Sequence, residues 1–250
     1  MNRTWMPVWG AANTYKAKTP TILLSDETVG ETRKRAEPVS SARVKTHEGA
    51  EPVAKVTTSI LSFRNMHQHG NLLVKYLEAR KAIFVDALRW TVCEADGMEF
   101  DQYDTPFCRW IVLHREGTVL GGVRMMPTTA QCGIYSYMLR DAQNGLLQDL
   151  PTDILFFPAP VEHNVWEATR FFITDVVSAE NRQRIQTLLF RAMSRTAMQQ
   201  GATHVIGIVP AIWARWARRL GVRATPIGAK FSIDGISSQA VLFRARDYLC

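Results

Sequence analysis

Cysteine is scarce in this 250-residue sequence, which contains only four. Cys93, Cys108, Cys132 and Cys250 form no Cys-x-x-Cys pair, and none of them groups with the six histidines. A zinc site or a disulfide framework needs such spacings, so neither is predicted. We expect free thiols in a reducing cytosol and no metal.

Long hydrophobic runs are also missing, although 46% of the residues are hydrophobic. The longest apolar run near the start is Ile22-Leu23-Leu24, which is too short for the apolar core of a signal peptide. No stretch of 18 apolar residues occurs that could span a membrane. We therefore expect a cytoplasmic protein with an ordinary buried core and no membrane partner.

Aromatic residues are absent between Lys16 and Ser62, and the first 60 residues contain four prolines and mixed charges. Such a segment cannot bury enough apolar surface to offset the entropy lost on ordering. We expect residues 1–62 to form a flexible N-terminal extension and residues 63–250 to form one folded domain. Trp5 and Trp9 are the exception, since either ring could dock on the domain, but an exposed tail is the favoured interpretation.

Acidic residues are missing from residues 181–233, which contain eight arginines and one lysine. This segment carries a charge of +9, whereas the whole chain carries +7. Such an imbalance favours an acidic macromolecular partner, which can be nucleic acid, an anionic membrane or an acidic carrier protein. The arginines expected to form this surface are Arg182, Arg184, Arg191, Arg195, Arg215, Arg218 and Arg219.

From residue 72 onward the hydrophobic pattern predicts regular secondary structure. Helices are expected from Leu72 to a point before Trp90, from Ser178 to Gly201 and over residues 210–220, with at most a short helix around residues 138–147. Strands are expected at residues 109–114, 118–125, 165–173, 203–209 and 240–244. Gly121-Gly122 inside the second strand suggests a bulge or the close approach of a ligand. This order predicts an α/β fold with a mixed sheet covered by helices on both faces.

Three carboxylates, Glu99, Asp101 and Asp104, stand within six residues of one another in a predicted loop. Unpaired buried carboxylates cost several kcal/mol each, so this acidic cluster predicts a cationic partner. Arg124 interrupts an otherwise apolar strand, and an arginine buried there needs a carboxylate. A pair of acids in a loop is by itself more often solvated than functional.

The spacing of the signature residues resembles that of the acyl-homoserine-lactone synthases, over roughly residues 72–221. The residues that carry the resemblance are Arg80, Phe84, Trp90, the acidic cluster, Arg124-Met125-Met126-Pro127-Thr128-Thr129 and Trp166-Glu167-Ala168-Thr169-Arg170. The resemblance implies a GNAT-like three-layer α-β-α sandwich around a mixed, V-splayed sheet. It also implies an acyltransferase that joins an acyl group, delivered on acyl carrier protein, to the amine of S-adenosylmethionine. Lactone closure then releases methylthioadenosine, and no further cofactor is implied.

The resemblance assigns roles to individual residues. S-adenosylmethionine is expected to bind Arg80, Phe84, Trp90, Asp101, Asp104 and Arg124. Glu167, Arg170 and Glu99 are the catalytic candidates, with Glu167 as the general base. That role needs a raised pKa, which we expect Trp166 and Phe171 to provide by desolvation. Glu167 and Arg170 should face opposite sides of a strand unless a bulge intervenes, and the alternative role for Glu167 is an ion pair with Arg170 or Arg124.

The acyl chain is expected to lie against Thr169, Phe171, Met193 and Gly207. In the family, a threonine on the strand that carries Gly207 accompanies 3-oxo-acyl donors. Gly207 therefore predicts a donor without the 3-oxo group.

Other functional classes remain open. A GNAT acyltransferase that uses coenzyme A and another amine would bind pyrophosphate at a glycine-rich turn, but residues 174–180 contain no glycine and two acids. A nucleic-acid-binding module would use Trp213 and Trp216 beside the arginines, but it leaves the acidic residues unexplained. An inactive relative is disfavoured because every signature position is filled.

Overall fold

The computed structural model describes residues 56–210, 213 and 221–248. At their centre is a seven-stranded sheet in the order β1-β4-β5-β6-β7-β9-β8. Neighbouring strands run antiparallel except β6 and β7, which are parallel, so the sheet is mixed as predicted. The strands are β1 (Thr57–Leu61), β4 (Arg109–Arg115), β5 (Thr118–Pro127), β6 (Val165–Ile173), β7 (His204–Pro210), β8 (Thr225–Ile233) and β9 (Ile236–Arg244).

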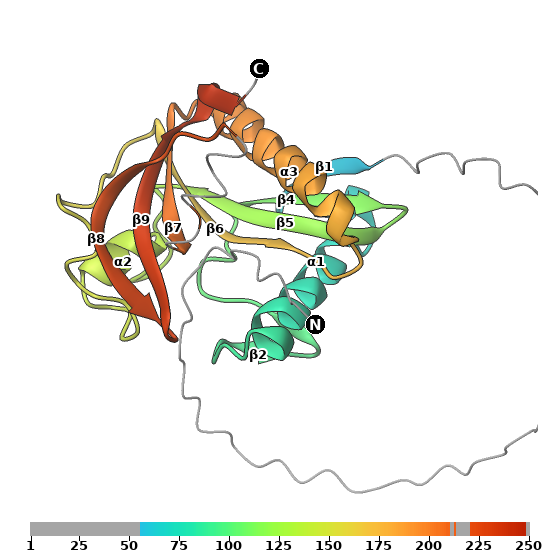
Figure 1. The fold of residues 1–250 in the computed structure, drawn as a ribbon, viewed down its shortest axis with the longest axis horizontal. Helices are drawn as coiled ribbons and strands as arrows, with labels where there is room; N and C mark the ends of the chain where they lie inside the picture. The colour runs from blue at the N-terminus through green and yellow to red at the C-terminus, as the bar shows by residue number, and fades with distance from the viewer. Residues whose placement is uncertain (1–55, 211–212, 214–220, 249–250) are drawn as a thin grey trace, which may run out of the picture. The chain divides into compact units, whose positions relative to one another are not determined.

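Helices cover both faces of this sheet. Figure 1 shows α3 on one side of β4 and β5 and α1 on the other. Phe171 and Phe172 are successive residues of β6, and they lie in two different hydrophobic clusters, one towards α3 and one towards α1. The helical elements are η1 (Met66–His69), α1 (Leu72–Lys81), a π-helical continuation η2 (Ala82–Ala87), α2 (Met138–Gln143), α3 (Ala179–Gln199) and η3 (Ala245–Tyr248).

The parallel pairing of β6 with β7 is short. It joins only Val165–Glu167 to His204–Ile206, although each strand continues for several more residues. The two strands therefore separate beyond Glu167, which gives the V-shaped splay expected of a GNAT-like sheet.

A bulge interrupts β6 immediately after this point. Gly122 pairs with Phe172 and Arg124 pairs with Thr169, so the single residue Val123 faces two residues of β6. One of the two is Arg170, whose φ of +55° is uncommon for a residue other than glycine. The extra residue turns Arg170 to the same face of the sheet as Glu167, which confirms the bulge that the sequence left open.

Several local predictions are confirmed. Glu116 and Gly117 have φ values of +50° and +79°, as a two-residue hairpin turn requires. Gly201, at φ +81°, follows the end of α3. Ser178 stands at the N-cap position of α3, but its hydroxyl accepts a hydrogen bond from Asn181 Nδ2 instead of capping a backbone N–H.

Other predictions need correction. The boundary placed after residue 62 is too late, because β1 (Thr57–Leu61) pairs with β4 along its whole length. Strand β8 was not predicted. The close approach at Gly121-Gly122 is made by the protein itself, since a Cβ on Gly122 would clash with the ring of Tyr76. The helix expected over residues 210–220 lies outside the described residues except for Pro210, which ends β7, and Trp213.

Candidate functional site

A closed ring of six alternating charges lies under the sheet on the α1 side. Glu99 comes from β3 (Met98–Glu99), which pairs with β2 (Glu94–Ala95), and the other two carboxylates follow in the next turns. The three arginines come from α1, from β5 and from the bulge in β6. We call these residues the charged ring; its members are Arg80, Glu99, Arg170, Asp101, Arg124 and Asp104.

Each arginine of the charged ring bridges two carboxylates. Arg80 donates from Nε to Glu99 Oε2 at 2.5 Å and from Nη1 to Asp104 Oδ1 at 2.8 Å. Arg170 Nη2 lies 2.9 Å from Glu99 Oε1 and 3.0 Å from Asp101 Oδ2. Arg124 closes the ring, because it contacts both oxygens of Asp101 and lies 2.9 Å from Asp104 Oδ2.

Neutral side chains make further hydrogen bonds to members of the charged ring. Asp104 also accepts a hydrogen bond from Trp110 Nε1 at 2.8 Å, and Arg124 Nε donates to Thr169 Oγ1 at 3.0 Å. Among the described residues, Arg80 Nη2 is buried and has no hydrogen-bond partner. One strong donor of the charged ring is therefore available to another acceptor.

An aromatic ring lies against each of the three arginines. The guanidinium carbon of Arg80 lies 5.7 Å from the ring centroid of Tyr76, that of Arg124 lies 5.6 Å from Tyr103, and that of Arg170 lies 5.3 Å from Phe84. These distances fit cation–π contacts. Phe84 also stacks on Trp90 with centroids 5.0 Å apart, so Trp90 lies next to the ring that contacts Arg170.

Two carboxylates of the charged ring, Glu99 and Asp104, stay ionised near neutral pH. Burial alone would raise the pKa of Glu99, but Arg170 and Arg80 outweigh it and lower that pKa to about 2. Burial likewise opposes ionisation of Asp104, whose pKa falls well below its usual range because of Arg124 and Arg80. A carboxylate held in this way is not a proton acceptor, so Glu99 binds and positions its two arginines.

Glu167 lies on the same face of β6 but outside the charged ring. Its two oxygens accept hydrogen bonds from the N–H groups of Met138 and Leu139, at 2.9 and 2.8 Å, at the first residues of α2. The ion pairs of Arg124 and Arg170 within the described ranges are made to Asp101, Asp104 and Glu99, not to Glu167, which argues against the ion pair considered as the alternative. Burial is the main reason that the pKa of Glu167 rises to about 7, a value suited to a base at neutral pH.

The source of that desolvation differs from the prediction. Trp166 and Phe171 belong to the cluster on the opposite face, towards α3. The strand neighbours of Glu167 are Met126 on β5 and Ile206 on β7, which lie in the cluster on its own side.

The residues expected around the acyl chain are divided between the two faces. Phe171 and Met193 lie together in the cluster under α3. Gly207 is buried on β7 between Ile206 and Ile208, whose side chains face α1, so its own Cα faces α3. Thr169 instead faces α1, where its hydroxyl accepts the hydrogen bond from Arg124.

Three residues of this region were not assigned a role from the sequence. Trp110 binds Asp104, and Tyr103 lies under Arg124. Asp141, on α2, is a buried carboxylate that accepts a hydrogen bond from the hydroxyl of Tyr103 at 2.9 Å. No local signal marks Asp141, because it stands beside Arg140 in a short helix that also carries Gln143.

The described part of the basic surface lies on α3. Arg184, Arg191 and Arg195 are exposed and recur at seven and four residues, which places them along one side of the helix. Arg182 is half-buried and pairs with Asp175 at 2.9 Å. Arg215, Arg218 and Arg219 lie outside the described residues, as does Trp216.

Three observations limit other kinds of site. Trp213 is only 2% exposed, so it offers no face to a nucleic-acid base. Within the described ranges, no three His, Cys, Asp or Glu side chains are grouped as a metal ion would require. No helix in the same ranges has the length and apolar character needed to cross a membrane.

Comparisons with known proteins identify relatives of this chain. A family model described as autoinducer synthase matches residues 64–247. The acyl-homoserine-lactone synthase of Ralstonia nicotianae is 33% identical over 162 residues, covering 62% of this chain and 74% of that protein. The structure of TofI in a ternary complex with an inhibitor and MTA is 26% identical, with a TM-score of 0.60 and coverage of 75% of this chain and 91% of TofI.

A second solved structure supports the fold. The CoA-dependent acyl-homoserine lactone synthase BjaI, with SAM and isopentyl-CoA, is 22% identical with a TM-score of 0.63, covering 78% of this chain and 86% of BjaI. The sandwich of helices around a splayed sheet is thus that of the GNAT-like synthases. The chain belongs to the autoinducer synthase family, and it is an acyltransferase that makes an acyl-homoserine lactone signal.

Proposed function

We propose that the chain makes its signal from S-adenosylmethionine and an acyl group carried on acyl carrier protein. The amine nitrogen attacks the thioester carbon, the carbon–sulfur bond breaks, and the carrier leaves as a thiol. The amine proton passes to Glu167, directly or through water, and from Glu167 to the sulfur of the departing carrier, which becomes the thiol. The carboxylate of the acylated intermediate then attacks its own γ-carbon, which closes the lactone and releases methylthioadenosine. No separate cofactor is needed, and we expect the reaction to occur in the cytoplasm.

The position of Glu167 carries this proposal. Glu167 is the last residue of β6 that pairs with β7, so it stands where the two strands begin to separate. Its pKa of about 7 leaves a substantial fraction ionised at neutral pH and ready to accept a proton. It shares a face of the sheet with the charged ring, so an amine bound by the ring and a thioester entering the splay would meet beside it.

The charged ring suits a zwitterionic amino acid with a sulfonium group. Asp101 and Asp104 can bind the cationic groups, and the unpaired Nη2 of Arg80 can bind the substrate carboxylate. Phe84 and Trp90 provide an aromatic wall beside these charges.

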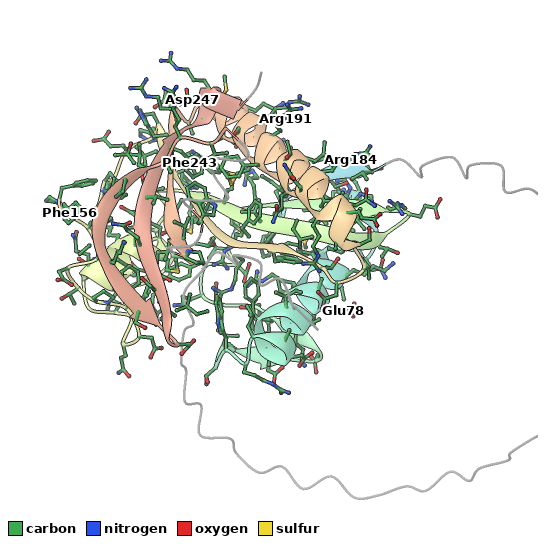
Figure 2. The ribbon with its side chains drawn as sticks, in the orientation of Figure 1. Glu78, Phe156, Arg184, Arg191, Phe243 and Asp247 are labelled. Atoms are coloured by element: carbon green, nitrogen blue, oxygen red, sulfur yellow. The ribbon has the colours of Figure 1, made fainter. Side chains whose placement is uncertain are left out.

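The donor is proposed to be acyl carrier protein for two reasons. Figure 2 shows Arg184 and Arg191 extending from α3 away from the sheet, where an acidic carrier can reach them. The turn before α3 carries Asp175, which is 84% exposed, and Glu180 lies in the first turn of the helix. Arg182 offsets the charge of Asp175, so Glu180 is the acid that would repel the pyrophosphate of coenzyme A. Coenzyme A remains the second candidate because BjaI, which shares the fold, is CoA-dependent.

The acyl group is proposed to lack a 3-oxo substituent. Gly207 offers no hydroxyl to a 3-oxo group on the strand where the family places a threonine. Phe171 and Met193 on the same face provide apolar surface for the chain.

The experiment is a comparison of donors with the purified protein. Acyl carrier protein and coenzyme A thioesters of the same acyl chain are each incubated with S-adenosylmethionine, and the lactone and methylthioadenosine are quantified by mass spectrometry. We expect equal amounts of the two products and a higher kcat/KM with the carrier protein. Reversing the charge at Arg184 and Arg195 should raise KM for the carrier protein only, whereas Arg115→Glu, at an exposed site on β4, should not. A higher kcat/KM with coenzyme A would refute the donor proposal.

A further inference from the structure

Asp141 is a buried carboxylate that the proposed reaction does not use directly. Its residue is 1% exposed, and no arginine or lysine forms an ion pair with it among the residues that the structure describes. The N–H of Ser136 donates to both of its oxygens at 3.0 Å, and the Ser136 hydroxyl donates to Oδ1 at 2.5 Å. The hydroxyl of Tyr103 donates to Oδ2 at 2.9 Å. Burial raises the pKa of Asp141, and the hydrogen bonds from Ser136 and Tyr103 oppose that rise by stabilising the charged form. Four hydrogen bonds received by two oxygens are the pattern of an ionised carboxylate.

These contacts connect the charged ring to the proposed base. The backbone N–H of Tyr103 donates a hydrogen bond to Asp101 Oδ1 at 2.9 Å, and the ring of Tyr103 lies against the guanidinium group of Arg124. On the other side, Asp141 belongs to α2, whose first residues Met138 and Leu139 hold the carboxylate of Glu167. One short helix therefore bonds directly to the proposed base and, through Tyr103, is connected to the charged ring.

We propose that Asp141 is a positioning residue, which fixes Tyr103 against the charged ring, orients Glu167 through α2 and acts on Glu167 by its own negative charge. This inference rests on the proposed function, in which Glu167 accepts the proton of the amine. Burying a carboxylate without a cationic side chain beside it costs free energy. The hydrogen bonds from Ser136 and Tyr103 offset that cost, and a neutral residue would not accept them equally well.

The charges around Glu167 give the inference a measurable sign. Arg124 faces it from β5 and lowers its pKa, whereas Asp141 faces it from α2 and raises it. Burial is the main reason that the pKa values of the Tyr103 and Tyr137 phenols are raised, and the charge of Glu167 adds to the rise in both. Both phenols are neutral near pH 7, so Asp141 is the negative neighbour whose removal should lower the pKa of Glu167.

The test is the pH dependence of kcat/KM in Asp141→Asn. Activity of the wild type should rise as Glu167 loses its proton, and in Asp141→Asn this rise should occur at lower pH. Titration of the substrates is common to both enzymes and cancels in their ratio. The variant should lose activity at all pH values, but the ratio of variant to wild type should be roughly threefold higher at pH 6 than at pH 8.

Gln143→Ala is the matched control. It removes hydrogen bonds between α2 and residues 157 and 159 without changing any charge, so its profile should keep the wild-type midpoint. If Asp141→Asn keeps that midpoint as well, the inference is wrong.

Tyr103→Phe decides the question if Asp141→Asn does not fold. In this variant, KM for S-adenosylmethionine should rise roughly threefold or more while KM for the acyl donor stays constant. An unchanged KM for S-adenosylmethionine would overturn the inference. A wild type that forms no lactone refutes the proposed function instead.

Discussion

The charged ring predicts a large loss of stability when one carboxylate is neutralised. Glu99→Gln keeps the shape of the side chain but leaves Arg80 and Arg170 short of one negative charge in a fully buried position. Removing one partner of a buried ion pair typically costs about 3–5 kcal/mol, because the remaining charge stays desolvated.

The pKa of Glu99 gives an independent magnitude. It falls from an ordinary value of 4.5 to about 2, a difference of about 2.5 units, which corresponds to about 3 kcal/mol of stability at pH 7. Because the folded pKa is depressed, this contribution is complete above pH 4.5 and is lost as the pH falls towards 2. At pH 4 it should already be smaller by about 1 kcal/mol.

Urea unfolding followed by circular dichroism measures these differences. At pH 7, Glu99→Gln should lower the free energy of unfolding by about 3 kcal/mol, and its Tm by about 6–12 °C. The gap to the wild type should narrow at pH 4. Glu94→Gln is the control, since Glu94 is 44% exposed and pairs with Lys81 at 3.3 Å, and a loss below about 1 kcal/mol is expected there. A Glu99→Gln variant as stable as Glu94→Gln would refute the claim that an ionised Glu99 stabilises Arg80 and Arg170 in the buried ring.

Two further substitutions test the base and the packing. Glu167→Gln should reduce lactone formation by roughly 10²- to 10⁴-fold, as measured by mass spectrometry. It should also lower the free energy of unfolding by about 1–3 kcal/mol, because one of the two backbone N–H groups at the start of α2 loses its acceptor. An undiminished yield would remove Glu167 from the mechanism. Gly122→Ala should destabilise the fold by about 1–3 kcal/mol in denaturant unfolding, because its Cβ would overlap the ring of Tyr76; a neutral result would show that α1 can shift away from β5.

Most of the fold could be predicted from local pattern, and the exceptions have physical reasons. Strand β8 was missed because its residues are half exposed and its pairing with β9 is interrupted between Pro226 and Lys230. The turn that joins the two strands was nevertheless visible, since Asp234-Gly235 is a strong hairpin signal and both residues have positive φ. Strand β1 was missed because a five-residue strand at the sheet edge carries little hydrophobic pattern.

The sequence could show that the acidic cluster needed cations, but not how the charges would pair. Glu99 and Arg170 are 71 residues apart, and their contact depends on the bulge in β6. An arginine at φ +55° has no sequence signature, because local preference disfavours it and only the surrounding packing and ion pairs maintain it. Asp141 was overlooked for a related reason, since its partners Ser136 and Tyr103 come together only in the folded chain.

The three carboxylates of the charged ring differ in solvent exposure, and this difference predicts which of them contacts the substrate. The side chain of Glu99 is 0% exposed, that of Asp101 is 3% exposed and that of Asp104 is 9% exposed, so access increases towards Asp104. A substrate that enters the ring can therefore reach Asp104 before the others, whereas Glu99 lies behind its two arginines. Asp104→Asn should then raise KM for S-adenosylmethionine by a larger factor than Glu99→Gln when both are assayed well below their unfolding temperatures. The opposite order would mean that substrate enters from the Glu99 side and that the ring must open to admit it.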